Sequence, residues 1–256
     1  MMQFAIYQIE KLVLRLLQPV LRKRSTRLRA AVKPLPPKSE LVYLEGKKPK
    51  TTTLLIIGES TAAGVGASTE EATFAYQVYH NLGQEYNVLN LGKNGLKAAE
   101  LPHLFASSKI IPPSISVAVI LIGANDCFGF TKPKEFTEAI LSFAGQLQKN
   151  HGTIKTVIQV IPPVYTFPAI PWIGKVLLGL HRFLLSSALR AKIVDFPSVT
   201  FMKNQQKFEA SFFAADGIHP SDTGYAAMAK ITAEFIKKGG FNETTFYPSY
   251  EPLFKP

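Results

Sequence analysis

Residues 54–66, LLIIGESTAAGVG, decide the fold because an apolar run stops at a glycine and gives way to small and polar residues. A short apolar run that ends at a turn residue is typical of a strand buried on both faces. Such strands belong to parallel sheets covered by helices. Ser60 therefore lies just past the end of a buried strand. It is either a nucleophile presented there or the hydroxyl that caps the next helix.

The same alternation of patterns continues along the chain. Apolar runs predict short buried strands at 53–57, 87–91, 117–122, 156–161 and 198–201. Helical periodicity fits between and after them, at 70–82, 98–107, 133–149, 173–194 and 221–238, the last with Ser221 or Asp222 as N-cap. Alternating strands and helices predict an α/β fold with a central parallel sheet of about five strands and helices on both faces.

The net charge of +11 is concentrated near the N-terminus. Residues 1–50 hold twelve Lys/Arg and three Asp/Glu, whereas the rest of the chain holds seventeen and fifteen. The body of the protein is therefore nearly neutral, which argues against nucleic acid as a partner. Positive charge concentrated near the N-terminus instead favours a membrane surface as the partner.

The N-terminal residues 3–21 predict an amphipathic helix with a narrow polar stripe. Cations at 22–29 follow, so residues 3–29 are predicted to bind an anionic membrane surface. The alternative is a helix packed on the body of its own protein. Charges inside the apolar run make it a poor spanning segment, and positive charge after that run is unlike a signal peptide.

These patterns divide the chain into three expected parts. A basic extension with a proline-rich linker covers 1–38, an α/β domain covers 39–238 and a tail covers 239–256. Cys127 is the single cysteine, which excludes an internal disulfide and a cysteine-rich zinc site and suits a reducing compartment. We therefore expect a cytoplasmic protein, peripheral on the inner face of the cytoplasmic membrane.

Residues able to do chemistry follow the predicted strands, at the edge where ligands gather in a parallel sheet. His219 is the best candidate base for Ser60, because imidazole titrates near neutral pH. Asp216 is near enough in a tight turn to orient that ring. The candidate oxyanion donors are the backbone N–H group of Ser60, at an expected helix start, the backbone N–H group of Gly95 and the side-chain amide of Asn125. Each residue alone is explained equally well as a helix cap or a turn residue. The prediction of a catalytic site therefore depends on all of them occurring together in this order.

That ordered set resembles the four sequence blocks of the SGNH (GDSL-type) hydrolases, over roughly residues 53–237. The resemblance implies a flavodoxin-like three-layer α/β/α fold and a serine esterase with Ser60, Asp216 and His219 as triad and Ser60, Gly95 and Asn125 as oxyanion hole. The family usually has Asp before the serine, whereas Glu59 stands here, which we interpret as tuning of the site. The blocks are Gly58-Glu59-Ser60, Asn94-Gly95, Gly123-Ala124-Asn125-Asp126 and Asp216-Gly217-Ile218-His219-Pro220.

Other motifs do not fit the sequence. Ala62 stands where a Gly-x-Ser-x-Gly elbow needs its second glycine, and no Gly-Lys-Ser/Thr follows as in a phosphate-binding loop. We expect neither a metal nor a cofactor, because the remaining histidines lack metal-ligand spacing. These are His80, His103, His151 and His181.

Residues 162–172, PPVYTFPAIPW, follow the fourth predicted strand at the same edge. They either wall an acyl pocket or form a rigid connection that buries its aromatic rings in the core. If the segment walls an acyl pocket, that pocket and the basic extension together favour a lipid or lysophospholipid ester as substrate. Two alternatives stay open: deacetylation of cell-envelope carbohydrate, and a non-catalytic membrane-associated binding module.

Overall fold

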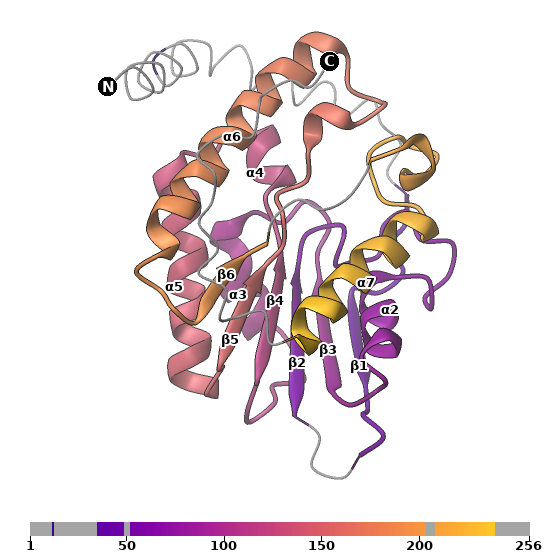
Figure 1. Ribbon diagram of the computed structural model, residues 1–256, viewed down its shortest axis with the longest axis vertical. Helices are drawn as coiled ribbons and strands as arrows, with labels where there is room; N and C mark the ends of the chain where they lie inside the picture. Colours follow the sequence, from indigo (N-terminus) through magenta and orange to yellow (C-terminus); the bar gives the residue numbers. More distant parts are fainter. Residues whose placement is uncertain (1–11, 13–34, 49–51, 203–207, 239–256) are drawn as a thin grey trace.

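The computed structural model describes residue 12 and residues 35–48, 52–202 and 208–238. The helix expected at 3–21, apart from Leu12, and the tail 239–256 lie outside these residues. The described chain builds a central sheet with helices on both faces (Figure 1). None of the helices in this part of the chain combines the length and the apolar character that crossing a membrane requires.

The sheet has six strands in the spatial order β1-β3-β2-β4-β5-β6. The five strands from β2 onward are parallel, which confirms the predicted parallel sheet. The sixth strand, β1, pairs antiparallel with β3 at the edge and was not predicted. The strands are β1 (Leu41–Leu44), β2 (Thr53–Gly58), β3 (Asn87–Gly92), β4 (Val117–Leu121), β5 (Lys155–Ile158) and β6 (Val199–Phe201).

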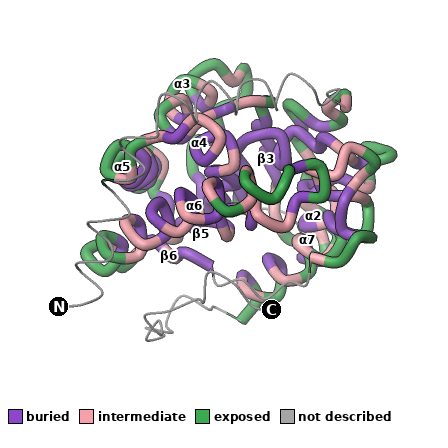
Figure 2. The backbone as a smooth tube through the Cα atoms, turned by 90° about the horizontal axis from the view of Figure 1, so that it is seen from above, coloured by how far each residue is buried: buried purple, intermediate pink, exposed green. Residues whose placement is uncertain are grey.

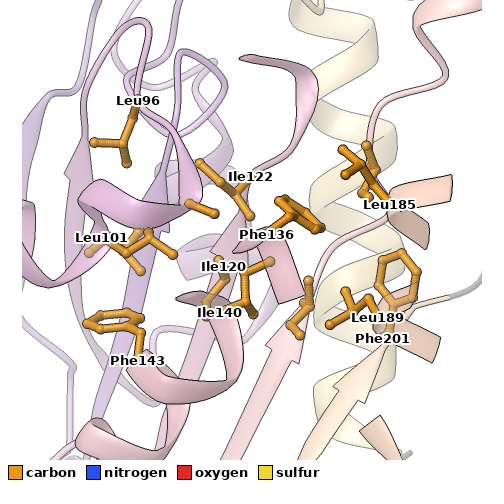
Figure 3. Close-up of a cluster of buried hydrophobic side chains, with 14 of the residues drawn as sticks. Leu96, Leu101, Ile120, Ile122, Phe136, Ile140, Phe143, Leu185, Leu189 and Phe201 are labelled. Carbon is orange, nitrogen blue, oxygen red and sulfur yellow. The ribbon is translucent and has the colours of Figure 1, made fainter. Parts of the chain in front are cut away.

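Alternate residues of the central strands face two separate hydrophobic layers. In β2, Leu54 and Ile56 belong to one core cluster and Leu55 and Ile57 to the other, and all four are fully buried. This is why the strand reads as an unbroken apolar run rather than an alternating one. Figure 3 shows the larger cluster, in which Ile120 of β4 lies among side chains from the covering helices.

Helices cover both faces of the sheet. One face carries α2 (Phe74–Asn81) and α7 (Asp222–Lys237), and the other carries α3 (Leu101–Ala106), α5 (Pro133–His151) and α6 (Trp172–Ile193). The short α4 (Ala124–Gly129) follows β4 and was not among the predicted helices. Three single-turn 3₁₀ helices complete the set: η1 (Ala98–Glu100), η2 (Val164–Thr166) and η3 (Ala210–Phe212). The three-layer α/β/α prediction is confirmed.

Local chemistry fixes several helix ends. Ser221 is the N-cap of α7, because its Oγ accepts a hydrogen bond from Gly224 N at 3.2 Å. Asp222 is the first residue of that helix and instead accepts hydrogen bonds from Ser68. Helix α5 starts at Pro133 and stops at Gly152, whose φ of +66° is left-handed.

The carboxyl ends of the parallel strands meet at one edge of the sheet, where α6 and α7 begin (Figure 1). Without β1, the strand order is that of a doubly wound sheet, with its switch point between β2 and β4. Figure 2 shows buried backbone enclosed by a more exposed periphery. The predicted site residues follow β2, β3 and β4 or precede α7, so the fold brings them to this single edge.

Candidate active site

The end of β2 is held tightly against β4. A Cβ atom placed on Gly58 would lie 2.0 Å from the carbonyl oxygen of Leu121, so a side chain at this position would collide with backbone. The next residue, Glu59, donates its N–H to that same oxygen at 2.9 Å. The close packing of β2 against β4 therefore requires glycine at position 58. The chain leaves the sheet at Ser60.

Ser60 opens an irregular turn over residues 60–66, and no helix starts at this serine. Val65 N donates to Ser60 O at 3.0 Å, while Gly64 and Gly66 have positive φ angles of +71° and +99°. Left-handed glycines stop a right-handed helix from forming. The predicted helix start is therefore wrong, and the capping interpretation of Ser60 goes with it, because the next helix begins only at Phe74.

The turn at 60–66, which we name the nucleophile turn, is braced by three other segments. Ser39, just before β1, donates its N–H to Ala63 O at 3.0 Å. Asn90 of β3 donates its side-chain amide to Ala62 O at 3.0 Å, and Tyr225 of α7 donates its hydroxyl to Val65 O at 2.7 Å. Asn90 was not predicted to support the site. The available signal was an amide in an otherwise apolar strand, where a buried polar group requires partners.

Glu59 joins the end of β2 to the start of α4. Its carboxylate is 1% exposed and accepts hydrogen bonds from Ala124 N at 2.9 Å, Asn125 N at 2.9 Å and Asn125 Nδ2 at 2.6 Å. The side-chain amide of Asn125 has two hydrogens, so one is held by Glu59 and the other can point at a substrate oxygen. Glu59 thus fixes the orientation of the predicted oxyanion donor, a role that the sequence analysis left unassigned.

The pKa of Glu59 is far from its ordinary value. Complete burial disfavours the carboxylate and the nearby Asp126 adds like charge, while the N–H groups of Asn125 and Ala124 favour the ionised form. Burial has the largest effect, and the pKa rises from 4.5 to about 7. This acid therefore changes charge near neutral pH.

Asp216 and His219 form a tight pair at the start of the α7 segment. His219 Nδ1 lies 2.6 Å from Asp216 Oδ2, and Asp216 Oδ1 accepts the backbone N–H groups of Ile218 and His219 at 3.0 Å each. Because an ionised carboxylate can only accept, Nδ1 carries the hydrogen and Nε2 is left as the basic nitrogen. The structure thus brings together Asp216 and His219, which the sequence placed three residues apart in one tight turn.

The pKa of Asp216 shifts below its ordinary value of 3.8. Burial acts to raise it, but the hydrogen bonds from the His219 side chain and from the backbone of His219 and Ile218 together outweigh burial. The Asp216 side chain is 4% exposed and that of His219 is 15% exposed. The imidazole is therefore the more accessible member of the pair.

The nucleophile turn and the Asp216–His219 loop lie against each other. A Cβ placed on Gly66 would lie 3.0 Å from His219 Cβ and 2.4 Å from Pro220 O, so the contact depends on the missing side chain. The structure gives no hydrogen bond between Ser60 and His219, both of which it describes. Catalytic hydrogen bonds are often long in the free enzyme and tighten with substrate.

The predicted oxyanion residue Gly95 follows β3. Its φ of +81° and the 3.2 Å hydrogen bond from Leu96 N to Lys93 O define a turn that needs glycine at this position. The preceding Gly92 packs against the nucleophile turn, because a Cβ there would lie 2.2 Å from Ala63 N. Within the described residues, neither the Gly95 N–H nor the Ser60 N–H has an acceptor. Both remain available for an oxyanion.

The proline-rich segment after β5 combines both predicted alternatives. Val164, Phe167 and Ile170 are buried in the core, as expected of a rigid connection. Trp172, however, is 74% exposed. The segment also contacts the site, because Ala169 N donates to Gly217 O, next to Asp216, at 3.3 Å.

Comparison with known proteins identifies relatives of this architecture. The family model described as "GDSL-like Lipase/Acylhydrolase family" matches residues 56–227. The spore germination lipase LipC of Bacillus licheniformis is 26% identical over 198 residues, which cover 68% of this chain and 91% of that protein.

Two solved structures have similar folds. Est24, a carbohydrate acetylesterase from Sinorhizobium meliloti, is 20% identical and gives a TM-score of 0.55, with 73% of this chain and 99% of that chain covered. The aryl esterase of M. smegmatis is 15% identical and gives a TM-score of 0.55, over 73% of this chain and 99% of its own. At such identities the likeness concerns the fold alone.

Proposed function

We propose, since this chain belongs to the GDSL-like lipase/acylhydrolase family and is an ester-hydrolysing enzyme, that it cleaves carboxylic esters through an acyl-enzyme intermediate. Ser60 is the nucleophile, His219 the general base and acid, and Asp216 the residue that orients the imidazole. The backbone N–H groups of Ser60 and Gly95 and the Asn125 amide bind the oxyanion. No cofactor takes part in this mechanism.

The proposed reaction has two stages. In the first, Ser60 Oγ attacks the ester carbonyl carbon while His219 Nε2 takes the hydroxyl proton, and the oxyanion donors stabilise the negative oxygen. The tetrahedral intermediate then expels the alcohol, which receives the proton from His219. In the second stage, water attacks the acyl-enzyme with His219 again as base, and the acid leaves as Ser60 regains its proton.

One observation carries this proposal: the 2.6 Å hydrogen bond between His219 Nδ1 and Asp216 Oδ2, in a loop packed against the nucleophile turn. It leaves Nε2 as the basic nitrogen of a histidine whose Cβ lies against Gly66, six residues after Ser60. A polar surface histidine would not need a nearly buried carboxylate on its other nitrogen.

Covalent labelling with a fluorophosphonate probe tests the mechanism. The unmutated protein is expected to label, and labelling should disappear in Ser60→Ala and fall strongly in His219→Ala. Ser107→Ala is the matched control, since Ser107 is exposed and bonds only within its own turn. Unlabelled wild-type protein, or labelling that survives in Ser60→Ala, would refute the assignment.

For the substrate we propose a lipid or lysophospholipid ester. The exposed apolar residues Pro168 and Ala169 lie against Gly217 of the Asp216–His219 loop, and the exposed Trp172 follows them in the chain, which favours a long acyl chain. The acetylesterase Est24 supports a second candidate, deacetylation of cell-envelope carbohydrate. A series of p-nitrophenyl esters separates the two: kcat/KM that rises with chain length supports the lipid ester, and activity confined to acetate supports the carbohydrate.

A further inference from the structure

A cluster of exposed apolar residues lies at the entrance to α6. We name it the apolar ledge and define it as Pro168, Ala169, Pro171, Trp172, Ile173 and Val176, all exposed. Trp172 is 74% exposed and Ile173 45%. Contiguous apolar surface of this kind marks an interaction site more often than scattered single residues do.

The apolar ledge is rigidly attached beside the candidate active site. It follows β5, so it lies at the carboxyl edge of the sheet, and Ala169 N bonds to Gly217 O at 3.3 Å. Phe167 and Ile170 are buried beneath it, and the Phe167 ring packs against Phe213 with centroids 5.8 Å apart. The exposed residues are thus presented by a fixed support.

The basic N-terminal segment joins the protein at the same edge. Lys38 and Ser39 both donate their N–H groups to Ala63 O, in the nucleophile turn, at 2.9 and 3.0 Å. Ser39 is the fourth residue after Leu35, which limits the distance between them to about 13 Å along an extended chain. Residues 1–34 therefore connect to the described protein close to the candidate site.

The charges around this edge suit a negatively charged surface. Residues 1–34 contain eight Lys/Arg and a single acidic residue, Glu10. Residues 160–194, which include the apolar ledge, contain no Asp or Glu. An exposed tryptophan flanked by aliphatic residues and basic charge is typical of binding at the headgroup level of an anionic bilayer.

We infer that the apolar ledge docks the carboxyl edge of the sheet onto an anionic lipid bilayer, with Trp172 and Ile173 entering the headgroup boundary. Docking does not depend on the proposed catalysis. That the enzyme draws its ester from the lipid phase does rest on the proposed function. In this orientation the Asp216–His219 loop faces the membrane.

Trp172 fluorescence tests this docking directly, because it is the only tryptophan of the chain. The full-length protein is titrated with vesicles of equal phosphatidylglycerol and phosphatidylcholine, and with vesicles of phosphatidylcholine alone. We expect emission to shift to shorter wavelength, and brominated acyl chains to quench it, with the anionic vesicles. The neutral vesicles should give at least about a tenfold weaker response, since each basic residue adds to attraction by anionic lipid.

Ile173→Glu is expected to weaken binding to the anionic vesicles by about tenfold, the effect of losing one buried aliphatic side chain. Ile154→Glu is the matched control. Ile154 is also exposed, at 66%, but it precedes β5 and so lies at the opposite edge of the sheet. Its substitution should leave vesicle binding unchanged.

Three results would overturn the inference: no response to anionic vesicles, equal loss in Ile173→Glu and Ile154→Glu, or short-wavelength Trp172 emission already in buffer. The last result would mean that residues 3–29 cover the apolar ledge themselves. Hydrolysis of a soluble short-chain ester is measured in parallel. Failure of catalysis then affects the proposed function and leaves the fluorescence result to decide docking.

Discussion

Glu59 and Asp216 are two buried carboxylates in the same candidate site, and their pKa values move in opposite directions. Glu59 lies under the oxyanion side of the site, where burial raises its pKa to about 7 despite three hydrogen bonds from Ala124 and Asn125. Asp216 lies on the acid–base side, where burial is outweighed by hydrogen bonds from His219 and Ile218, and its pKa is lowered.

The difference separates two tasks. In the proposed mechanism, Asp216 stays ionised so that it can hold the imidazole and stabilise its charged form. Glu59 touches no reacting atom, because its oxygens are occupied by the start of α4, and it acts through Asn125 as a positioning residue. A carboxylate used for orientation tolerates a high pKa, whereas one that stabilises a cation requires a low one.

The largest expected effect comes from Asp216→Asn. An amide at this position can donate to Nδ1, so the ring would carry its hydrogen on Nε2 and could not accept the Ser60 proton. We expect kcat to fall about 10³- to 10⁴-fold. Asp222→Asn is the control, because Asp222 bonds to Ser68 instead of His219 and its loss should leave kcat nearly unchanged. Equal losses in the two variants would contradict the role of Asp216.

The second prediction concerns stability and pH. The folded protein keeps a proton on Glu59 up to about pH 7, whereas the unfolded chain releases it near 4.5. The free energy of unfolding should therefore fall as pH rises between these values, by up to about 3 kcal/mol. Asp216 has the opposite effect on stability. Its contribution to the free energy of unfolding is fully present above pH 3.8 and is lost as the pH falls through its lowered pKa.

Urea unfolding of the wild type and of Glu59→Gln across pH 4.5 to 8 measures the Glu59 contribution. The variant has no carboxyl group at this position, so the difference between the two proteins isolates its titration. A difference that does not change with pH would show that Glu59 is not perturbed as described.

The third prediction is that Glu59→Gln also lowers the rate of ester hydrolysis. Gln offers one acceptor oxygen where Glu59 offers two, so Asn125 loses part of its support, and kcat is expected to fall about thirtyfold with little change in KM. Glu59→Asp keeps both acceptor oxygens and should retain more activity. If Glu59→Asp loses as much as Glu59→Gln, carboxylate hydrogen bonding is not what positions the amide.

The smallest expected effect is that of Tyr225→Phe, which removes the hydroxyl that α7 donates to Val65 O. We expect the free energy of unfolding to fall by about 1 kcal/mol and kcat by only a few-fold. Tyr79→Phe is the control, because its hydrogen bond to Glu45 O is exposed and should contribute less. Thermal unfolding measures the stability of both variants, and ester hydrolysis measures their kcat.

Sequence patterns did not predict several elements of the structure. Strand β1 has only four residues, with alternating exposure and charged neighbours, so it lacks the apolar run that revealed the others. Helix α4 is too short to show helical periodicity. The turn at 60–66 was mistaken for a helix start because the left-handed angles of Gly64 and Gly66 are properties of the folded backbone.

The sequence by itself determined the parallel α/β architecture and the order of the polar blocks that follow its strands. Hydrophobic periodicity and chain order are local properties, and parallel strands place their carboxyl ends together. Only the tertiary structure decided what Glu59 does. Its partner Asn125 is 66 residues away in the chain, and its raised pKa depends on burial that several distant segments create together.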